Sequence, residues 1–394
     1  MYLLNESEVI RDIGRLDRAW SEPETFVFLS DRSGVPIEWV EQRMALFPES
    51  FREGHFVLMT SGSTGRPKLV VGLRKRAERL AAALHVVQDS EPAKETAVLL
   101  PLTYCYAFVN QWLWARLKGR KLVLTAGFGQ PDAVLKTLAE AKDCLLCLVG
   151  AMLPMFAAHI PEGVSFPGVA RLHFAGGRFP QEKLGVILRY FPNARIFNNY
   201  GCAEAMPRLT MRSREESDEA ANIGRPIPGV EMKVGNTGEI LFRSEYGAVG
   251  MCDDGGLFAP GENDWIPTGD LGEQLDGGCW RIKGRTNEVF KRFGEKISLL
   301  QLLETVQTQW RGQAAFYREC DLSGEDGHVL VLAPEATKGQ VQEILRAFRQ
   351  SHPRTHWPLR VESIVTMPTL PNGKVDYGAL AASEGKTIHW RQRI

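Results

Sequence analysis

The sequence lacks an excess of charge of either sign, because 47 lysine and arginine residues balance 47 aspartate and glutamate residues. Proteins that bind nucleic acid or a membrane surface by electrostatic attraction usually carry a basic face. The sequence also lacks an uninterrupted apolar stretch long enough to cross a bilayer. Met1–Arg11 carries Glu6 and Glu8 and lacks the apolar segment of a signal peptide. We therefore expect no nucleic acid partner and no membrane insertion.

Cysteine is scarce and scattered, with seven residues in the chain. Only Cys144 and Cys147 have CxxC spacing, and they lie in an apolar run typical of a buried strand. No second pair follows, so the spacing does not predict a zinc site. An odd, dispersed set favours reduced thiols and a cytoplasmic protein. His352 and His356 are interpreted as ordinary loop histidines, because Pro353 separates them and no HExxH glutamate is present.

The length of 394 residues exceeds what one small core needs and suits a large domain with a smaller one. The apolar fraction of 44% and the charged fraction of 24% are those of an ordinary globular protein. Repeats and low-complexity linkers are absent from the sequence. The chain therefore has enough apolar residues for a sizeable core in each domain.

One run of small residues is the most informative stretch: Thr60, Ser61, Gly62, Ser63, Thr64 and Gly65, closed by Lys68. Small residues let backbone N–H groups crowd an anion, hydroxyls add donors, and lysine adds a compact positive charge. A Walker A loop is excluded because Pro67 and Leu69 flank the lysine, and a nucleophile elbow because Ser61 stands where glycine is needed. The run predicts a polyphosphate loop of another kind, and a flexible connector remains the plainer interpretation of the run by itself.

Strands and helices alternate after this loop. Short apolar runs at 96–100, 121–125, 145–149, 170–174 and 194–198 are separated by helical patterns at 108–118, 131–141, 151–159 and 180–191, and a further helix is expected at 74–88. This alternation indicates parallel strands joined by crossover helices. Near the end, a strand at 328–333, a helix at 338–350 and a strand at 359–366 predict a small α/β domain.

The phosphate-loop run resembles that of the adenylate-forming (AMP-binding) superfamily, which includes acyl- and aryl-CoA synthetases, nonribosomal peptide adenylation domains and luciferases. The resemblance extends from about Phe56 to Leu380. It implies an α/β fold, with a large N-terminal domain of parallel and mixed sheets flanked by helices, hinged to a small C-terminal domain. We place the border between residues 1–286 and 287–394. The region before the loop, 1–55, is shorter than is usual in the family, and it has no assigned chemistry.

Two further segments carry the resemblance on the nucleotide side. Ala175, Gly176 and Gly177 follow an expected strand, and the family's matching segment holds the adenine. The second segment is Asn199-Tyr200-Gly201-Cys202-Ala203-Glu204, similar to the family's Tyr-Gly-x-Thr-Glu, with alanine in place of threonine. The resemblance implies that Tyr200 stacks on the adenine and that Glu204 binds Mg2+, a cation that prefers carboxylate and phosphate oxygens. Ala175 and Cys202 are expected beside the acid.

Tyr104 and Cys105 resemble the aromatic segment that lines the family's acyl pocket. Cys105 falls about where amino-acid-activating members keep an aspartate for the substrate ammonium. A thiol does not pair with an ammonium group, so the sequence disfavours an α-amino acid. That both residues are only buried packing residues is the alternative.

The last matching segments place residues on the border and in the small domain. By resemblance Asp270 holds the ribose hydroxyls, Arg285 contacts ribose or phosphate, and Asn287 is the hinge. Pro371-Asn372-Gly373 is a strong turn signal that presents Lys374, the family's lysine for adenylation.

The resemblance implies a ligase that uses ATP and Mg2+ to activate a small carboxylic acid as acyl-AMP. It then transfers the acyl group to coenzyme A or to the phosphopantetheine of an acyl or aryl carrier protein. Lys374, Glu204 and Lys68 are the expected catalytic residues. The alternatives are an amino-acid-activating enzyme and a degenerate, non-catalytic nucleotide-binding protein.

Overall fold

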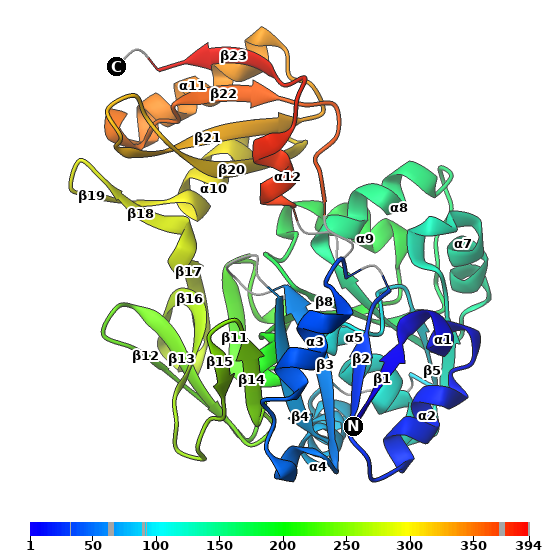
Figure 1. Cartoon of the computed structure of the whole chain (residues 1–394). Helices are drawn as coiled ribbons and strands as arrows, with labels where there is room; N and C mark the ends of the chain where they lie inside the picture. Colours follow the sequence, from blue (N-terminus) through cyan, green and yellow to red (C-terminus); the bar gives the residue numbers. More distant parts are fainter. Residues whose placement is uncertain (32, 62–66, 89–90, 92, 370–374, 393–394) are drawn as a thin grey trace. The chain divides into compact units, whose positions relative to one another are not determined.

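The computed structural model describes residues 1–31, 33–61, 67–88, 91, 93–369 and 375–392 of the chain (Figure 1). The backbone forms two compact units: residues 1–268 with 272–282, and residues 269–271 with 283–394. The border predicted between 286 and 287 stays a prediction. In the described part of the chain, no helix combines the length and the apolar character needed to cross a membrane.

The largest sheet has the strand order β12-β13-β16-β17-β11-β10-β9-β8-β7-β5-β6. Its parallel part consists of β6 (Lys121–Leu124), β5 (Glu95–Val98), β7 (Cys144–Val149), β8 (Val169–Ala175) and β9 (Arg195–Tyr200). The strands on the other side of β9 are β10 (Thr210–Ser213), β11 (Asn222–Pro226), β12 (Val230–Val234), β13 (Glu239–Ser244), β16 (Ile266–Gln274) and β17 (Trp280–Arg285). β10 pairs antiparallel with both β9 and β11. The predicted run of parallel strands is confirmed.

Helices cover the parallel strands, as crossover connections require. They are α4 (Arg74–Val87), α5 (Cys105–Ala107), a π-helical segment η2 (Phe108–Leu113), α6 (Trp114–Lys118), α7 (Pro131–Glu140), α8 (Leu153–His159) and α9 (Leu184–Tyr190). β7 is buried on both faces: Leu146 and Leu148 join the main core, whereas Leu145 and Cys147 pack with Trp114 of α6. Both faces are apolar, which explains why β7 has no polar alternation in the sequence.

A second sheet of the first unit has the order β1-β2-β3-β4-β14-β15. Its strands are β1 (Tyr2–Asn5), β2 (Phe26–Leu29), β3 (His55–Ser61), β4 (Pro67–Leu73), β14 (Gly250–Asp253) and β15 (Gly256–Phe258). The N-terminal segment also forms α1 (Glu6–Arg11), α2 (Gly14–Ser21) and α3 (Ile37–Met44). β2 is buried along its whole length. Residues 1–55 therefore add two strands to the sheet that ends at the predicted phosphate loop.

The second unit is built on the sheet β20-β21-β22-β23. Its elements are the hairpin β18 (Val289–Arg292) and β19 (Glu295–Ser298), then α10 (Leu299–Gln309), β20 (Gln313–Cys320), β21 (Asp326–Ala333), α11 (Lys338–Ser351), β22 (Arg360–Ser363), α12 (Tyr377–Ala382) and β23 (Thr387–Arg391). α10 and α11 pack on one face of this sheet, and Leu380 of α12 packs on the other. The predicted strand, helix and strand are present as β21, α11 and β22.

Candidate active site

The predicted phosphate loop joins two antiparallel strands. β3 and β4 pair with Thr60 opposite Lys68 and Met59 opposite Leu69. Gly62, Ser63, Thr64 and Gly65 lie outside the described residues, and so does the side chain of Ser61. The strong hydrogen-bonded pairing fixes the two ends of the loop and sets the direction in which Lys68 leaves the strand.

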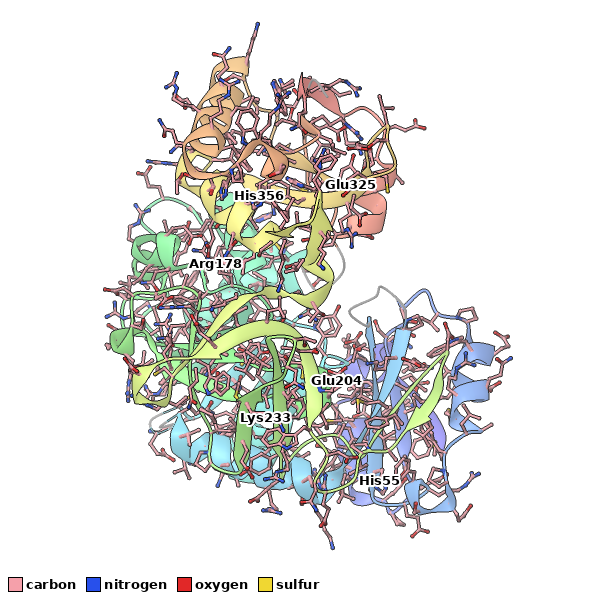
Figure 2. All side chains as sticks on the ribbon, turned by 90° about the vertical axis from the view of Figure 1, so that its left-hand side faces the viewer. His55, Arg178, Glu204, Lys233, Glu325 and His356 are labelled. Carbon is pink, nitrogen blue, oxygen red and sulfur yellow. The ribbon has the colours of Figure 1, made fainter. Side chains whose placement is uncertain are left out.

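Lys68 meets Glu204 although the two residues are 136 positions apart. The Lys68 Nζ atom lies 3.1 Å from Oε1 of Glu204, and the two side chains retain 24% and 19% of their exposure. Glu204 lies in a short 3-10 turn, Ala203–Ala205, which follows the end of β9 (Figure 2). The structure therefore brings together two of the three residues predicted to be catalytic. The third, Lys374, lies outside the described residues.

A neutral, sulfur-containing surface lies beside this pair. Cys105 is buried, and its Sγ atom lies 3.8 Å from Sδ of Met206. Burial raises the pKa of the Cys105 thiol, and the nearby Glu204 carboxylate raises it further. Burial also raises the pKa of Tyr104 to about 12, with a smaller contribution from the charge of Glu6. Both groups are therefore neutral at pH 7, and neither offers a counter-charge for an ammonium group.

The predicted adenine segments leave two neighbouring parallel strands at the same edge. β8 ends at Ala175 and β9 ends at Tyr200, and the two strands pair in register with Phe174 opposite Asn198. Gly176, directly after β8, has φ +77°, a conformation that favours glycine. Ligands of open α/β sheets collect at the carboxyl ends of the strands. The position of Ala175–Gly177 and Tyr200–Cys202 therefore suits a ligand.

Asn199 is the exception among the residues of this segment. Its side chain is 3% exposed, and its amide bonds to Arg208 and His173 inside the core. The sequence analysis did not single out Arg208, because a lone arginine after Met-Pro matches no local pattern. Its role is developed below.

In the second unit, Asp270 and Arg285 form an ion pair. Arg285 Nη1 lies 2.8 Å from Oδ1 of Asp270, whose side chain is 9% exposed. Gly269 has φ +78°, and a Cβ atom there would lie 2.9 Å from Nη2 of Arg285, so only glycine allows this approach. The backbone of Asn287 lies in a short 3-10 turn, Thr286–Glu288. The two residues predicted to bind the nucleotide sugar are therefore in direct contact.

The residues present suit a magnesium ion that is held largely by a nucleotide. Among the described residues, no three His, Cys, Asp or Glu side chains gather into a metal cluster. Mg2+ in nucleotide enzymes commonly uses one or two carboxylates, and phosphate oxygens and water complete its shell. Glu204 offers one partly exposed carboxylate next to the end of the phosphate loop. A single acid fits a nucleotide-bound Mg2+ better than a resident structural metal.

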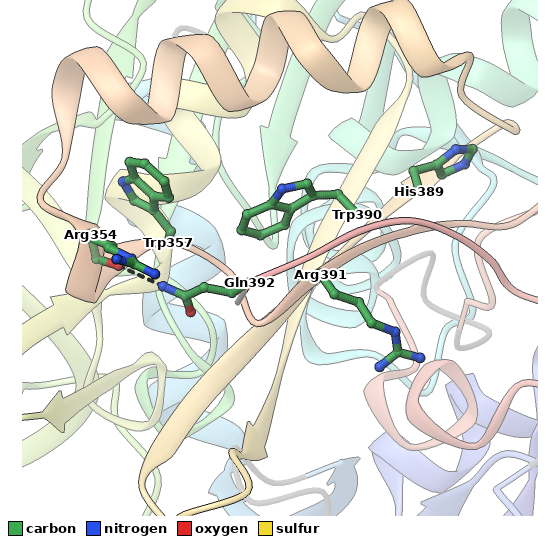
Figure 3. Close-up of a pocket in the computed structure, with 6 residues that line it drawn as sticks. All are labelled: Arg354, Trp357, His389, Trp390, Arg391 and Gln392. Carbon is green, nitrogen blue, oxygen red and sulfur yellow. Dashed lines mark hydrogen bonds between the residues drawn. The ribbon is translucent and has the colours of Figure 1, made fainter. Parts of the chain in front are cut away.

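The second unit has a hollow of about 500 Å³ between the short turn before β22 and the last strand (Figure 3). It is lined by two indole rings and by polar side chains: Arg354, Trp357, His389, Trp390, Arg391 and Gln392. Gln392 Nε2 donates a hydrogen bond to the Arg354 carbonyl at 3.1 Å. None of the predicted site residues lines the hollow, so it is separate from the candidate active site.

Comparison with solved structures supports the fold. The chain is similar to o-succinylbenzoate CoA synthetase from Bacillus subtilis in complex with an acyl-adenylate intermediate, with a TM-score of 0.74, 17% identity, and coverage of 96% of this chain and 87% of that chain. It is also similar to the anthranilate CoA ligase AuaEII in complex with anthranoyl-AMP, with a TM-score of 0.70, 16% identity, and coverage of 96% and 77%. At these identities the likeness establishes the fold.

Sequence relatives are more distant in length than in fold. Delta-poly-L-ornithine synthetase of Acinetobacter baumannii is 25% identical over 83% of this chain and 26% of its own length. A CoA ligase of Rhodococcus jostii that acts on a methyl-dioxo-octahydroindenyl propanoyl group is 23% identical over 81% of this chain and 63% of its own length. The chain thus spans less than two thirds of these relatives.

The family comparison covers more than half of the chain. Residues 21–250 match the family described as AMP-binding enzyme. This region includes the phosphate-loop strands, the Tyr104–Cys105 segment, and the turn that carries Glu204. The chain therefore belongs to the AMP-binding enzyme family.

Proposed function

We propose that the protein is an AMP-forming acid–thiol ligase. The observation that carries the proposal is the contact of Lys68 with Glu204 at 3.1 Å, at the joined ends of β4 and β9. A cation that can face a triphosphate and a carboxylate that can face a metal are thereby placed side by side. Tyr200 and the Gly176–Gly177 turn leave the same edge of the sheet, where an adenine ring would fit.

In the first half-reaction, a carboxylate oxygen of the acid attacks the α-phosphorus of ATP. A P–O bond to the α-phosphorus breaks, and pyrophosphate leaves with the electron pair. The chain's contribution is positioning and charge stabilisation. The residues 60–68 hold the outer phosphates, and Lys374 stabilises the charge on the α-phosphate. Mg2+, held by Glu204 and the phosphates, offsets negative charge when it is bound.

In the second half-reaction, a thiol attacks the carbonyl carbon of the acyl adenylate, and AMP leaves. Asp270 holds the ribose throughout, with Arg285 beside it. The small domain pivots at Asn287, which withdraws Lys374 and brings the loop at Gly294 to the site. The thiol belongs to coenzyme A or to the phosphopantetheine of a carrier protein.

The neutral surface near Glu204 favours an acid without an α-amino group. Cys105 and Met206 are buried and uncharged, so they would leave an ammonium group without a partner in that position. The solved relatives support an aromatic acid, because one of them is an anthranilate CoA ligase with bound anthranoyl-AMP. An aryl or other non-amino carboxylic acid is therefore the proposed substrate class.

Activation of an amino acid is the second candidate, and it is favoured by relatives named as poly-L-ornithine and gramicidin synthetases. ATP–pyrophosphate exchange across a panel of aryl, fatty and amino acids separates the two. The proposal expects exchange with aryl or other non-amino acids. Exchange confined to amino acids would replace it with the second candidate. ATP binding without exchange for any acid would indicate a non-catalytic nucleotide-binding protein, for which Ala203 in place of threonine gives a reason.

A further inference from the structure

Arg208 is a fully buried arginine without an acidic partner. Its side chain is 1% exposed. Its Nη1 atom donates to Oδ1 of Asn199 and its Nη2 atom to Oδ1 of Asn110, both at 2.6 Å. In the part of the chain that the structure describes, no carboxylate lies within 4 Å of the guanidinium. Burial of an unbalanced charge is costly, so a merely structural position would more economically hold an apolar residue.

The two amides that accept these hydrogen bonds are also engaged at their other ends. Asn199 Nδ2 donates to Nδ1 of His173 at 3.0 Å, and Asn110 Nδ2 donates to the Tyr106 carbonyl at 2.7 Å. Burial lowers the pKa of His173, and the charge of Arg208 lowers it further, so its ring is neutral and Nδ1 can accept. The guanidinium thus fixes the orientation of both amides.

These amides belong to the two segments of the candidate site. Asn199 directly precedes Tyr200, on the adenine side. Asn110 lies in the π-helical segment Phe108–Leu113, which begins three residues after Cys105, on the acid side. π-Helical turns inside helices often occur at functional sites. Arg208 therefore links the adenine side of the site to the acid side through two short hydrogen bonds.

The backbone around Arg208 is packed against the same site. Leu209 N donates to the Tyr200 carbonyl at 2.9 Å. A Cβ atom on Gly201 would lie 1.9 Å from the Pro207 carbonyl oxygen and 3.0 Å from the Arg208 Cα, so this approach requires glycine. Met206 has φ +57°, a left-handed conformation that is strained for a residue with a side chain. Such strain is commonly retained where a site needs it.

We propose that Arg208 is a positioning residue that holds the Tyr200 segment and the Cys105 segment in register for nucleotide binding. The inference rests on the proposed function, because it concerns the same site. Arg208 does not contact the nucleotide; it acts through Asn199 and Asn110. Its loss should displace Tyr200 relative to Cys105, with the fold otherwise retained.

The test is AMP binding to the full chain, measured by calorimetry with Arg208→Met and Arg208→Lys. Arg74→Met is the matched control, because Arg74 is also buried and donates to the main-chain carbonyls of Trp20, Glu22 and Glu24. We expect Arg208→Met to weaken AMP binding about tenfold or more, since small misplacements in a site have large effects. Arg208→Lys, which keeps a donor, should recover part of the loss. Arg74→Met should lower the melting temperature and leave AMP affinity within about twofold.

Each result decides between outcomes. Equal AMP affinity in Arg208→Met and the wild type would overturn the inference and leave the proposed function intact. A wild-type chain that binds no AMP would overturn the proposed function itself. If Arg208→Met does not fold, Asn110→Ala removes one anchor only. Weaker AMP binding by the folded Asn110→Ala variant would support the inference, and unchanged binding would overturn it.

Discussion

Lys68 and Glu204 neutralise each other across 3.1 Å, at the junction of two sheets' strand ends. Lys68 begins β4 of the six-stranded sheet, and Glu204 follows β9 of the eleven-stranded sheet. A cation and a carboxylate that pair without ligand can each take a new partner when a triphosphate and its Mg2+ arrive. The contact is thus a ready-made ground state for charge exchange.

Replacement of Lys68 by alanine should lower ATP–pyrophosphate exchange about 100-fold, because removal of one group that stabilises transition-state charge commonly has this effect. Lys75→Ala, which removes an exposed lysine of α4, is the matched control and should leave exchange unchanged. Exchange rates at saturating Mg2+ measure the difference. A Lys68→Ala enzyme as active as the control would contradict the assigned role.

Replacement of Glu204 by glutamine should raise the Mg2+ concentration needed for half-maximal exchange, because an amide is a weaker ligand for Mg2+ than a carboxylate. The side chain keeps its size, so the fold should tolerate the change. A titration of exchange against Mg2+ checks this. The same half-maximal Mg2+ concentration in both proteins would remove Glu204 as the metal ligand.

Asp270→Asn should weaken ATP binding about tenfold, because an amide has one acceptor oxygen where the carboxylate has two for a vicinal diol. The loss should be smaller with 2′-deoxy-ATP, which lacks one of the two hydroxyls. Asp276→Asn, at an exposed turn, is the control. An equal loss for both nucleotides would show that Asp270 acts through Arg285 and not through the ribose.

Much of the fold could be predicted because its signals are local. The strand at 145–149 is a continuous apolar run, and the structure places Leu146 and Cys147 on opposite buried faces of β7. β1, β2 and β23 could not be predicted in the same way. Each has four or five residues, and each is defined by a partner elsewhere in the chain, as β23 is by β22.

The site was partly accessible for a similar reason. The ordered series of motifs identified Lys68 and Glu204, and the structure added their contact. Arg208 carries no such signal, since burial of a charge depends on what surrounds it. Only the three-dimensional arrangement places it between Asn199 and Asn110.

Lys374→Ala should abolish adenylation and leave transfer from a supplied acyl adenylate to a thiol largely intact. The reason is that the lysine acts on the α-phosphate, which is no longer transferred in the second step. Lys338→Ala, at the exposed start of α11, is the control. Both half-reactions are followed by product formation, and an equal loss in both would contradict the role of Lys374.

His328 makes the stability of the second unit depend on pH. The residue is 0% exposed, with its ring between Phe290 and Phe316 at centroid distances of 5.8 and 5.1 Å. Burial, with a smaller contribution from the charge of Arg292, lowers the pKa of His328 to about 3. The histidine therefore stays neutral in the folded protein at pH values where an unfolded chain takes up a proton.

An unfolded histidine binds a proton below about pH 6.5, whereas folded His328 does so only near pH 3. The free energy of unfolding should therefore fall as the pH drops from about 6.5 toward 3. His328→Leu removes this proton uptake, so its loss of stability between pH 8 and pH 5 should be smaller than the wild type's by about 1–2 kcal/mol. Urea unfolding at both pH values measures it. His159→Gln, at an exposed position, should behave like the wild type, and an identical pH dependence in His328→Leu would mean that His328 is already protonated in the fold.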